Sequence, residues 1–170
     1  MRNEIIIKPL VGIEWAQGNI LLGQQKKQLD ISHLLPETVR QSLYLLGADI
    51  RVDFDGTDAV EFVEVRGGCG SLLCPVFDRM PLFEMEVTEV LKALREKYVV
   101  KERENGHMYV LTEWDIALWR ERTEADVEGF VADMKADGVA AEGNPDVEAE
   151  WKLAKHFQVV SIGKKGYFAG

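Results

Sequence analysis

The clearest structural signal in the chain lies at residues 50–65, which read IRVDFDGTDAVEFVEV. Apolar and charged residues alternate along its first half: Ile50, Val52 and Phe54 with Arg51, Asp53 and Asp55. Successive side chains of a strand point to opposite faces, so this alternation predicts a strand with one buried face. A turn signal, GTD, follows at 56–58, and β-branched and aromatic residues at 60–65 predict a returning strand. We therefore expect a β-hairpin here.

A second hairpin is expected further along the chain. Apolar runs at 98–100 and 108–111 flank an Asn-Gly pair at 105–106. This pair favours a two-residue turn, because both central residues of that turn need a positive φ. Four other apolar runs have the length of strands: residues 4–10, 19–22, 115–119 and 157–162.

Helical spacing of apolar residues predicts four helices. They are expected at Pro36–Leu46, at Glu86–Lys97, from Thr123 to Gly138, and from Asn144 to His156. Thr123 with Asp126 has the spacing of a capping box, and Asn144 before Pro145 is typical of a helix start. The side chains expected to be buried on these helices include Leu91, Leu94, Val127, Phe130, Val131 and Trp151.

These elements predict an α+β protein. Hairpins imply antiparallel pairing, so we expect a single antiparallel sheet with about four helices packed mainly on one face. The length of 170 residues is that of a single globular domain, expected to span 1–170.

Composition and charge argue against a nucleic-acid-binding, secreted or membrane protein. Acidic residues outnumber basic ones by 29 to 20, which gives a formal net charge of −9. Such a chain repels phosphate backbones, so we expect no nucleic-acid partner. The apolar run at 5–7 is too short for a signal peptide or a membrane span, and two cysteines are too few for a secreted disulfide framework. We expect a cytoplasmic protein that does not bind membranes.

Two candidate metal sites lack part of their ligand sets. Counting from Asp53 as position 1 of a calcium loop places Asp58 where glycine is required, and the flanking elements are strands. Cys69 and Cys74 have no second cysteine pair to complete a zinc site. We therefore expect no metal and no other cofactor, and we interpret both cysteines as structural.

A nucleophilic thiol is the one catalytic alternative. Cys69 could act as a nucleophile if the fold brought His107 or His156 beside it as a base.

Among the four tryptophans, Trp119 and Trp151 lie on apolar faces and are expected in the core. Trp15 or Trp114 is the candidate for lining a ligand groove.

Several stretches carry a resemblance to known proteins. They are residues 12–15 with 21–23, 51–54 with 60–65, 81–83, 116–120 and 160–167. Together they resemble small uncharacterised bacterial proteins of one cytoplasmic domain, some of which are similar to the immunity proteins of bacterial toxin repertoires. The resemblance covers most of the chain, implies a binding protein, and assigns no catalytic residue.

We therefore expect a non-catalytic, acidic interaction protein, in the manner of an immunity protein, that binds a basic partner protein. The expected contact residues are Asp53, Asp55 and Glu61, whose carboxylates cluster on the first hairpin and would attract a cationic surface. The alternatives are a small thiol-dependent enzyme and a small-molecule-binding domain with a tryptophan-lined pocket.

Overall fold

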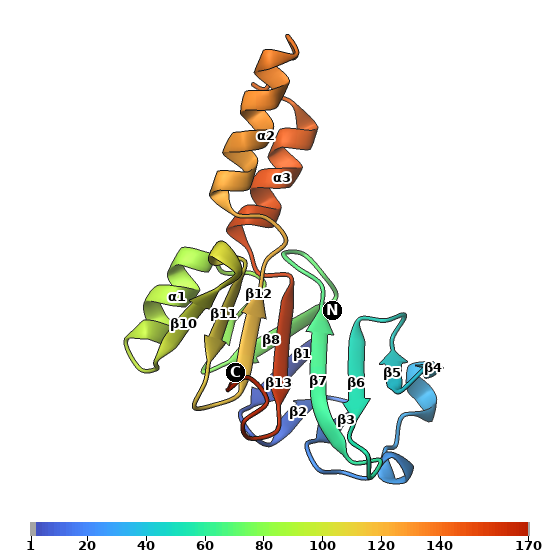
Figure 1. Cartoon of the computed structure of the whole chain (residues 1–170). Helices are drawn as coiled ribbons and strands as arrows, with labels where there is room; N and C mark the ends of the chain where they lie inside the picture. The colour runs from blue at the N-terminus through green and yellow to red at the C-terminus, as the bar shows by residue number, and fades with distance from the viewer. Residues whose placement is uncertain (1–2, 170) are drawn as a thin grey trace.

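The computed structural model describes residues 3–169, which form a mixed α+β fold with three α-helices and two sheets (Figure 1). The strand order is β3-β2-β1-β8-β9 in the five-stranded sheet and β10-β11-β12-β13-β7-β6-β5-β4 in the eight-stranded sheet. The α+β class is confirmed. The expectation of a single sheet with four helices is wrong.

The five-stranded sheet joins segments that are far apart in the chain. Its strands are β1 (Asn3–Lys8), β2 (Gly12–Trp15), β3 (Gly18–Leu21), β8 (Leu73–Phe77) and β9 (Met80–Pro81). β1 pairs in parallel with β8, whereas the other neighbours are antiparallel. The parallel pair explains why local hairpin signals did not reveal a second sheet.

The eight-stranded sheet is antiparallel throughout. Its strands are β4 (Glu37–Val39), β5 (Ser42–Leu45), β6 (Ile50–Phe54), β7 (Val60–Arg66), β10 (Val100–Arg103), β11 (Met108–Leu111), β12 (Ile116–Trp119) and β13 (Val159–Gly163). The hairpin predicted at residues 50–65 is confirmed as β6 and β7. Asp53 pairs with Phe62 and Phe54 with Val60, so Glu61 is the extra residue of a β-bulge.

The second predicted hairpin is also present, with a longer connection. β10 and β11 pair as expected, but a short 3-10 turn, η3 (Glu104–Gly106), joins them in place of a two-residue turn. Glu104, Asn105 and Gly106 all have a positive φ.

One hydrophobic cluster lies between the two sheets. Ile5, Ile13 and Ile20 belong to it from the small sheet. Val52, Val63, Val160 and Ile162 belong to it from the large sheet. Helix α1 (Val87–Arg95) adds Val90, Leu91 and Leu94, all buried as predicted. Each sheet therefore has one side that faces this core. The opposite side of each sheet faces away from the core.

The helix predicted at 36–46 is wrong, because this segment forms β4 and β5. A turn at residues 40–41, where Arg40 has a φ of 56°, reverses the chain. Leu43 and Leu45 are buried while Ser42 and Tyr44 are only half-buried, which is the two-residue period of a strand. The predicted helix depended on the spacing of Val39, Leu43 and Leu46, which are three and four residues apart. These residues have the spacing of a helix but do not form one.

Helices α2 (Glu124–Ala136) and α3 (Pro145–Lys155) form a hairpin that projects from the sheets (Figure 1). Their predicted starts are confirmed: Thr123 and Asp126 form a capping box, and Asn144 caps Asp146. Val127 is buried as predicted, but Phe130 is 37% exposed, and Val131 and Trp151 are only half-buried. The expected burial fails for Phe130 because α2 packs against α3 and not along the face of a sheet.

None of the helices in residues 3–169 combines the length and apolar character that crossing a bilayer requires. The longest, α2, has 13 residues, whereas a membrane span needs about 20.

Candidate binding groove

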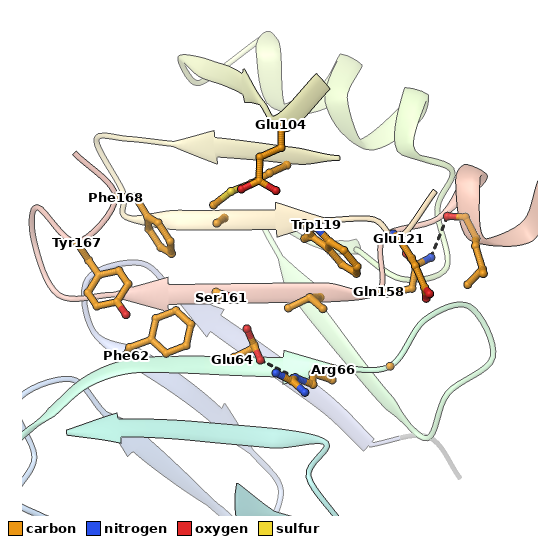
Figure 2. A pocket seen from close by; sticks show the side chains of 15 residues that line it. Phe62, Glu64, Arg66, Glu104, Trp119, Glu121, Gln158, Ser161, Tyr167 and Phe168 are labelled. Carbon is orange, nitrogen blue, oxygen red and sulfur yellow. Dashed lines mark hydrogen bonds and ion pairs between the residues drawn. The ribbon is translucent and has the colours of Figure 1, made fainter. Parts of the chain in front are cut away.

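A groove of about 760 Å³ runs over the side of the eight-stranded sheet that faces away from the small sheet. Its lining comes from β7, β11, β12 and β13, the C-terminal segment and the end of α3 (Figure 2). The lining residues are Phe62, Glu64, Arg66, Gly67, Glu104, Met108, Ala117, Trp119, Glu121, Leu153, Gln158, Val159, Ser161, Tyr167 and Phe168. Its volume is in the range of ligand pockets, about 300–1,000 Å³.

The alternation of side chains along β12 and β13 makes this groove. Val160 and Ile162 point into the core, so Val159 and Ser161 point to the groove. In β12, Ala117 lies opposite Ser161. These two small side chains at the centre form a low floor, and larger side chains rise around it.

A strap of residues 164–169 crosses one end of the groove. It is fixed by the buried carboxylate of Asp115, whose Oδ2 accepts a hydrogen bond from the Gly166 amide at 2.8 Å. Asp115 Oδ1 accepts a second one from the Phe168 amide at 3.0 Å. A buried charge needs such partners, so these bonds give a physical reason for an aspartate here.

The strap brings aromatic rings onto the sheet. Tyr167 stacks on Phe62 with ring centroids 5.0 Å apart, and Phe168 meets Tyr167 edge-on at 5.1 Å. Tyr167 can lie this low because it sits on Gly163, where a Cβ atom would be 2.4 Å from the Tyr167 Cβ. We call Phe62, Tyr167 and Phe168 the aromatic end.

The opposite end of the groove is built around Gln158, which is buried. Its Oε1 accepts a hydrogen bond from the Glu121 amide at 2.7 Å, and its Nε2 donates to the Leu153 carbonyl at 3.1 Å. Gln158 thereby joins the connection after β12 to the last turn of α3. Trp119 and Leu153 supply the apolar surface here, and Glu121 lies beside Trp119 (Figure 2).

The groove is negatively charged. Its lining holds Glu64, Glu104 and Glu121 against one cation, Arg66, and Arg66 is already paired with Glu64 at 2.5 Å. Among residues 3–169, neither Glu104 nor Glu121 has an ion pair or a side-chain hydrogen bond. Two exposed carboxylates therefore line the groove: Glu104 lies along one side of it, and Glu121 lies beside Trp119 at the end near Gln158 (Figure 2).

Charged groups of both signs lie near the aromatic end, and the guanidinium of Arg51 is 5.7 Å from the centroid of the Phe62 ring. The pKa of the Tyr167 hydroxyl is raised, first by burial and then by the negative charges of Asp53 and Glu61. Aromatic faces attract cations, and carboxylates strengthen that attraction. The arrangement is therefore suited to a ligand that carries positive charge and apolar groups, and it is unsuited to phosphate.

The three predicted contact residues have partners within the fold. Asp53 accepts hydrogen bonds from Arg51 Nε at 3.0 Å and Nη2 at 2.6 Å. Lys164 joins the other two, at 3.0 Å from Asp55 and 3.4 Å from Glu61. The pKa of Asp55 is held well below its ordinary value by hydrogen bonds from Thr57 and then from Lys164. Their charges are therefore largely compensated, and their role in partner binding stays a prediction.

The structure places the catalytic candidates apart. Cys69 is half-buried in the loop after β7, beside Ala149 and Lys152 of α3. His107 Nδ1 lies 3.1 Å from the Arg120 carbonyl oxygen, and His156 Nδ1 lies 3.2 Å from that of Met85. No contact recorded for the described residues joins Cys69 to either histidine.

The tryptophans occupy other places than the sequence suggested. Trp119 lines the groove, although we predicted it in the core. Trp15 is 8% exposed, and Trp114 packs edge-on against Tyr98, so neither lines the groove. The alternation of side chains in β12 could have predicted the position of Trp119. Trp119 follows the buried Leu118, so its side chain must point to the opposite face of the sheet.

No three His, Cys, Asp or Glu side chains within residues 3–169 gather in a way that could hold a metal ion.

No protein-family model matches the chain, and neither a curated protein nor a solved structure matches it. The case for function therefore depends on the chemistry of the groove itself.

Proposed function

We propose that the protein is a non-catalytic binding protein whose groove holds a positively charged segment of a partner protein. The observation that carries this proposal is the pair of exposed carboxylates, Glu104 and Glu121, that line the groove together with apolar side chains and the half-buried Trp119. The net charge of −9 would steer a basic partner toward the molecule and raise its rate of association.

Trp119 and Glu121 form the primary contact in this proposal. A guanidinium group over the indole would gain a cation–π interaction, worth about 0.5–2 kcal/mol. The Glu121 carboxylate, next to the indole, can pair with the same cation (Figure 2). Apolar side chains of the segment would then cover Val159 and Leu153.

The shape of the groove favours a segment of a protein over a small molecule. Small-molecule sites bury about 70–90% of their ligand. Here Tyr167, Arg66 and Glu121 line the groove and are still exposed, so a small ligand would be covered on one side only. A partner protein would cover its own segment from the other side.

Fluorine NMR of protein labelled with 5-fluorotryptophan tests this proposal. The four tryptophans give resonances that single Trp→Phe substitutions assign. A short peptide of arginine and leucine, titrated at low salt, is expected to shift the Trp119 resonance. Trp15 and Trp114 lie outside the groove and serve as internal controls.

Charge variants complete the test. The double variant Glu104→Gln with Glu121→Gln is expected to weaken binding of the peptide about tenfold, since two charge pairs are lost. The matched control is Glu96→Gln with Glu113→Gln, two exposed carboxylates outside the groove. An unmoved Trp119 resonance, or equal weakening by both double variants, would contradict the proposal.

An immunity-type role is one form of the proposed function, and that the partner is a toxin stays a prediction. An acidic immunity-type protein would place such a groove against a basic surface of its target. Competition between the peptide and a candidate toxin for the Trp119 signal would test this point.

A further inference from the structure

The hairpin of α2 and α3, which we call the arm, holds most of the formal net charge of the molecule. Residues 124–155 contain nine acidic and three basic side chains, a formal charge of −6 against −9 for the whole chain. The arm extends away from both sheets (Figure 1). Arg120 and Arg122, just before the arm, pair with Glu124 and Glu150, whereas no ion pair within residues 3–169 involves Glu128 or Glu142.

The arm also exposes apolar surface. A groove of about 570 Å³ lies between its two helices, lined by Val131, Ala132, Val147 and Trp151, with Ala141 at the tip. Val131 and Trp151 remain half-exposed there. The carboxylates of Glu128 and Glu142 line the same groove, together with Lys135. Apolar side chains rimmed by carboxylates repeat the chemistry of the sheet groove.

The base of the arm is fixed to the sheet. Buried Arg120 donates from Nε to the Gly106 carbonyl at 2.8 Å and from Nη1 to the Ala154 carbonyl at 2.6 Å. It also pairs with Glu124, in the first turn of α2, at 2.9 Å. Leu153 of α3 lines the sheet groove, so the base of the arm borders that groove.

We propose that the arm is a second docking surface for the same basic partner protein, which places apolar side chains around Trp151 and its cations against Glu128 and Glu142. The inference rests on the proposed function, because one partner contacts both surfaces. Charge complementarity identifies the occupant. A second copy of this chain would bring two arms of charge −6 together and would be repelled.

The test uses the labelled full-length chain and a long amphipathic helical peptide of leucine and lysine. This peptide is expected to shift the Trp151 resonance at low salt, and added salt should weaken it. Val131→Ser removes apolar surface from the arm groove, and Glu128→Gln with Glu142→Gln removes charge. Each change is expected to weaken binding about fivefold, while the matched control Glu96→Gln with Glu113→Gln leaves the affinity within about twofold.

The two proposals fail in distinguishable ways. If the arm variants leave the affinity for the long peptide unchanged and Trp151 does not respond, the arm proposal is overturned, whatever the short peptide does at Trp119. If the short peptide leaves Trp119 unmoved while Trp151 responds to the long one, the groove proposal fails and the arm surface stands. A dimer in sedimentation experiments that shields Trp151 would overturn the choice of a basic partner.

Discussion

Replacing Arg120 by methionine removes the group that fixes the arm to the sheet. The side chain is 5% exposed and is bonded to Gly106, to Ala154 and to Glu124. Methionine retains much of the aliphatic volume and leaves two carbonyl oxygens without their donor. The substitution therefore isolates the polar interactions from the packing.

The expected loss follows from those contacts. A hydrogen bond to a charged donor contributes about 1.5–3 kcal/mol, and Arg120 makes two to buried carbonyls. The Glu124 side chain is 46% exposed, so its pairing with Arg120 is screened by solvent and adds little. Leaving a buried carbonyl oxygen without its donor costs about 1–3 kcal/mol, and here two are left. We therefore expect Arg120→Met to lower the free energy of unfolding by about 3–5 kcal/mol.

Urea unfolding followed by circular dichroism measures this loss, provided that the slope of the transition is unchanged. Arg122→Met is the matched control, because Arg122 also pairs with the arm, at Glu150, but its side chain is 45% exposed. The control is expected to unfold like the wild type. Hydrogen exchange of α2 and α3 should increase in Arg120→Met alone.

A loss below about 1 kcal/mol in Arg120→Met would refute this reasoning, because a surface substitution changes stability by no more than that. Equal losses in both variants would also refute it, since burial would then not be the cause.

Three further predictions test the fold and the groove. Leu94→Ala, at a fully buried position of α1, should cost about 2–5 kcal/mol in urea unfolding. Gly163→Ala places a Cβ where Tyr167 lies, so it should displace the strap and change the Tyr167 ring signals in proton NMR. Asp55 and Asp126 have pKa values below their ordinary ones in the folded state, mainly through hydrogen bonds from Thr57 and Thr123. Their stabilisation is present above the unfolded pKa and is lost as the pH falls below about 4, so the Tm should drop there, and less steeply in Asp126→Asn.

The sequence predicted those strands and helices whose formation depends on neighbouring residues in the chain. The alternation at Ile50, Val52 and Phe54 predicted β6, and the capping box of Thr123 and Asp126 predicted the start of α2. The segment at 36–46 failed because the apolar spacing resembled a helix, whereas Leu43 and Leu45 follow the period of a strand and a turn at Arg40 reverses the chain.

Long-range pairing explains what the sequence did not reveal. β1 pairs with β8, as in the pair of Asn3 with Leu73, far apart in the chain, so no local pattern indicates the second sheet. The groove joins Glu104, Trp119 and Tyr167, which come close only when the strands and the strap are assembled. The acidic cluster at Asp53 and Asp55 was visible in the sequence, but the cation that compensates Asp55, Lys164, comes from the far end of the chain.

The most direct test of the cationic groove compares two peptides by calorimetry. One is the short arginine–leucine peptide, and the other carries neutral citrulline in place of each arginine. We expect the citrulline peptide to bind about tenfold more weakly, and Trp119→Ala to reduce this difference, because the cation loses its aromatic face while the carboxylates of Glu104 and Glu121 remain. Trp114→Ala, outside the groove, should retain the difference. Equal binding of the two peptides, or an undiminished difference in Trp119→Ala, would contradict the proposal that this groove recognises positive charge.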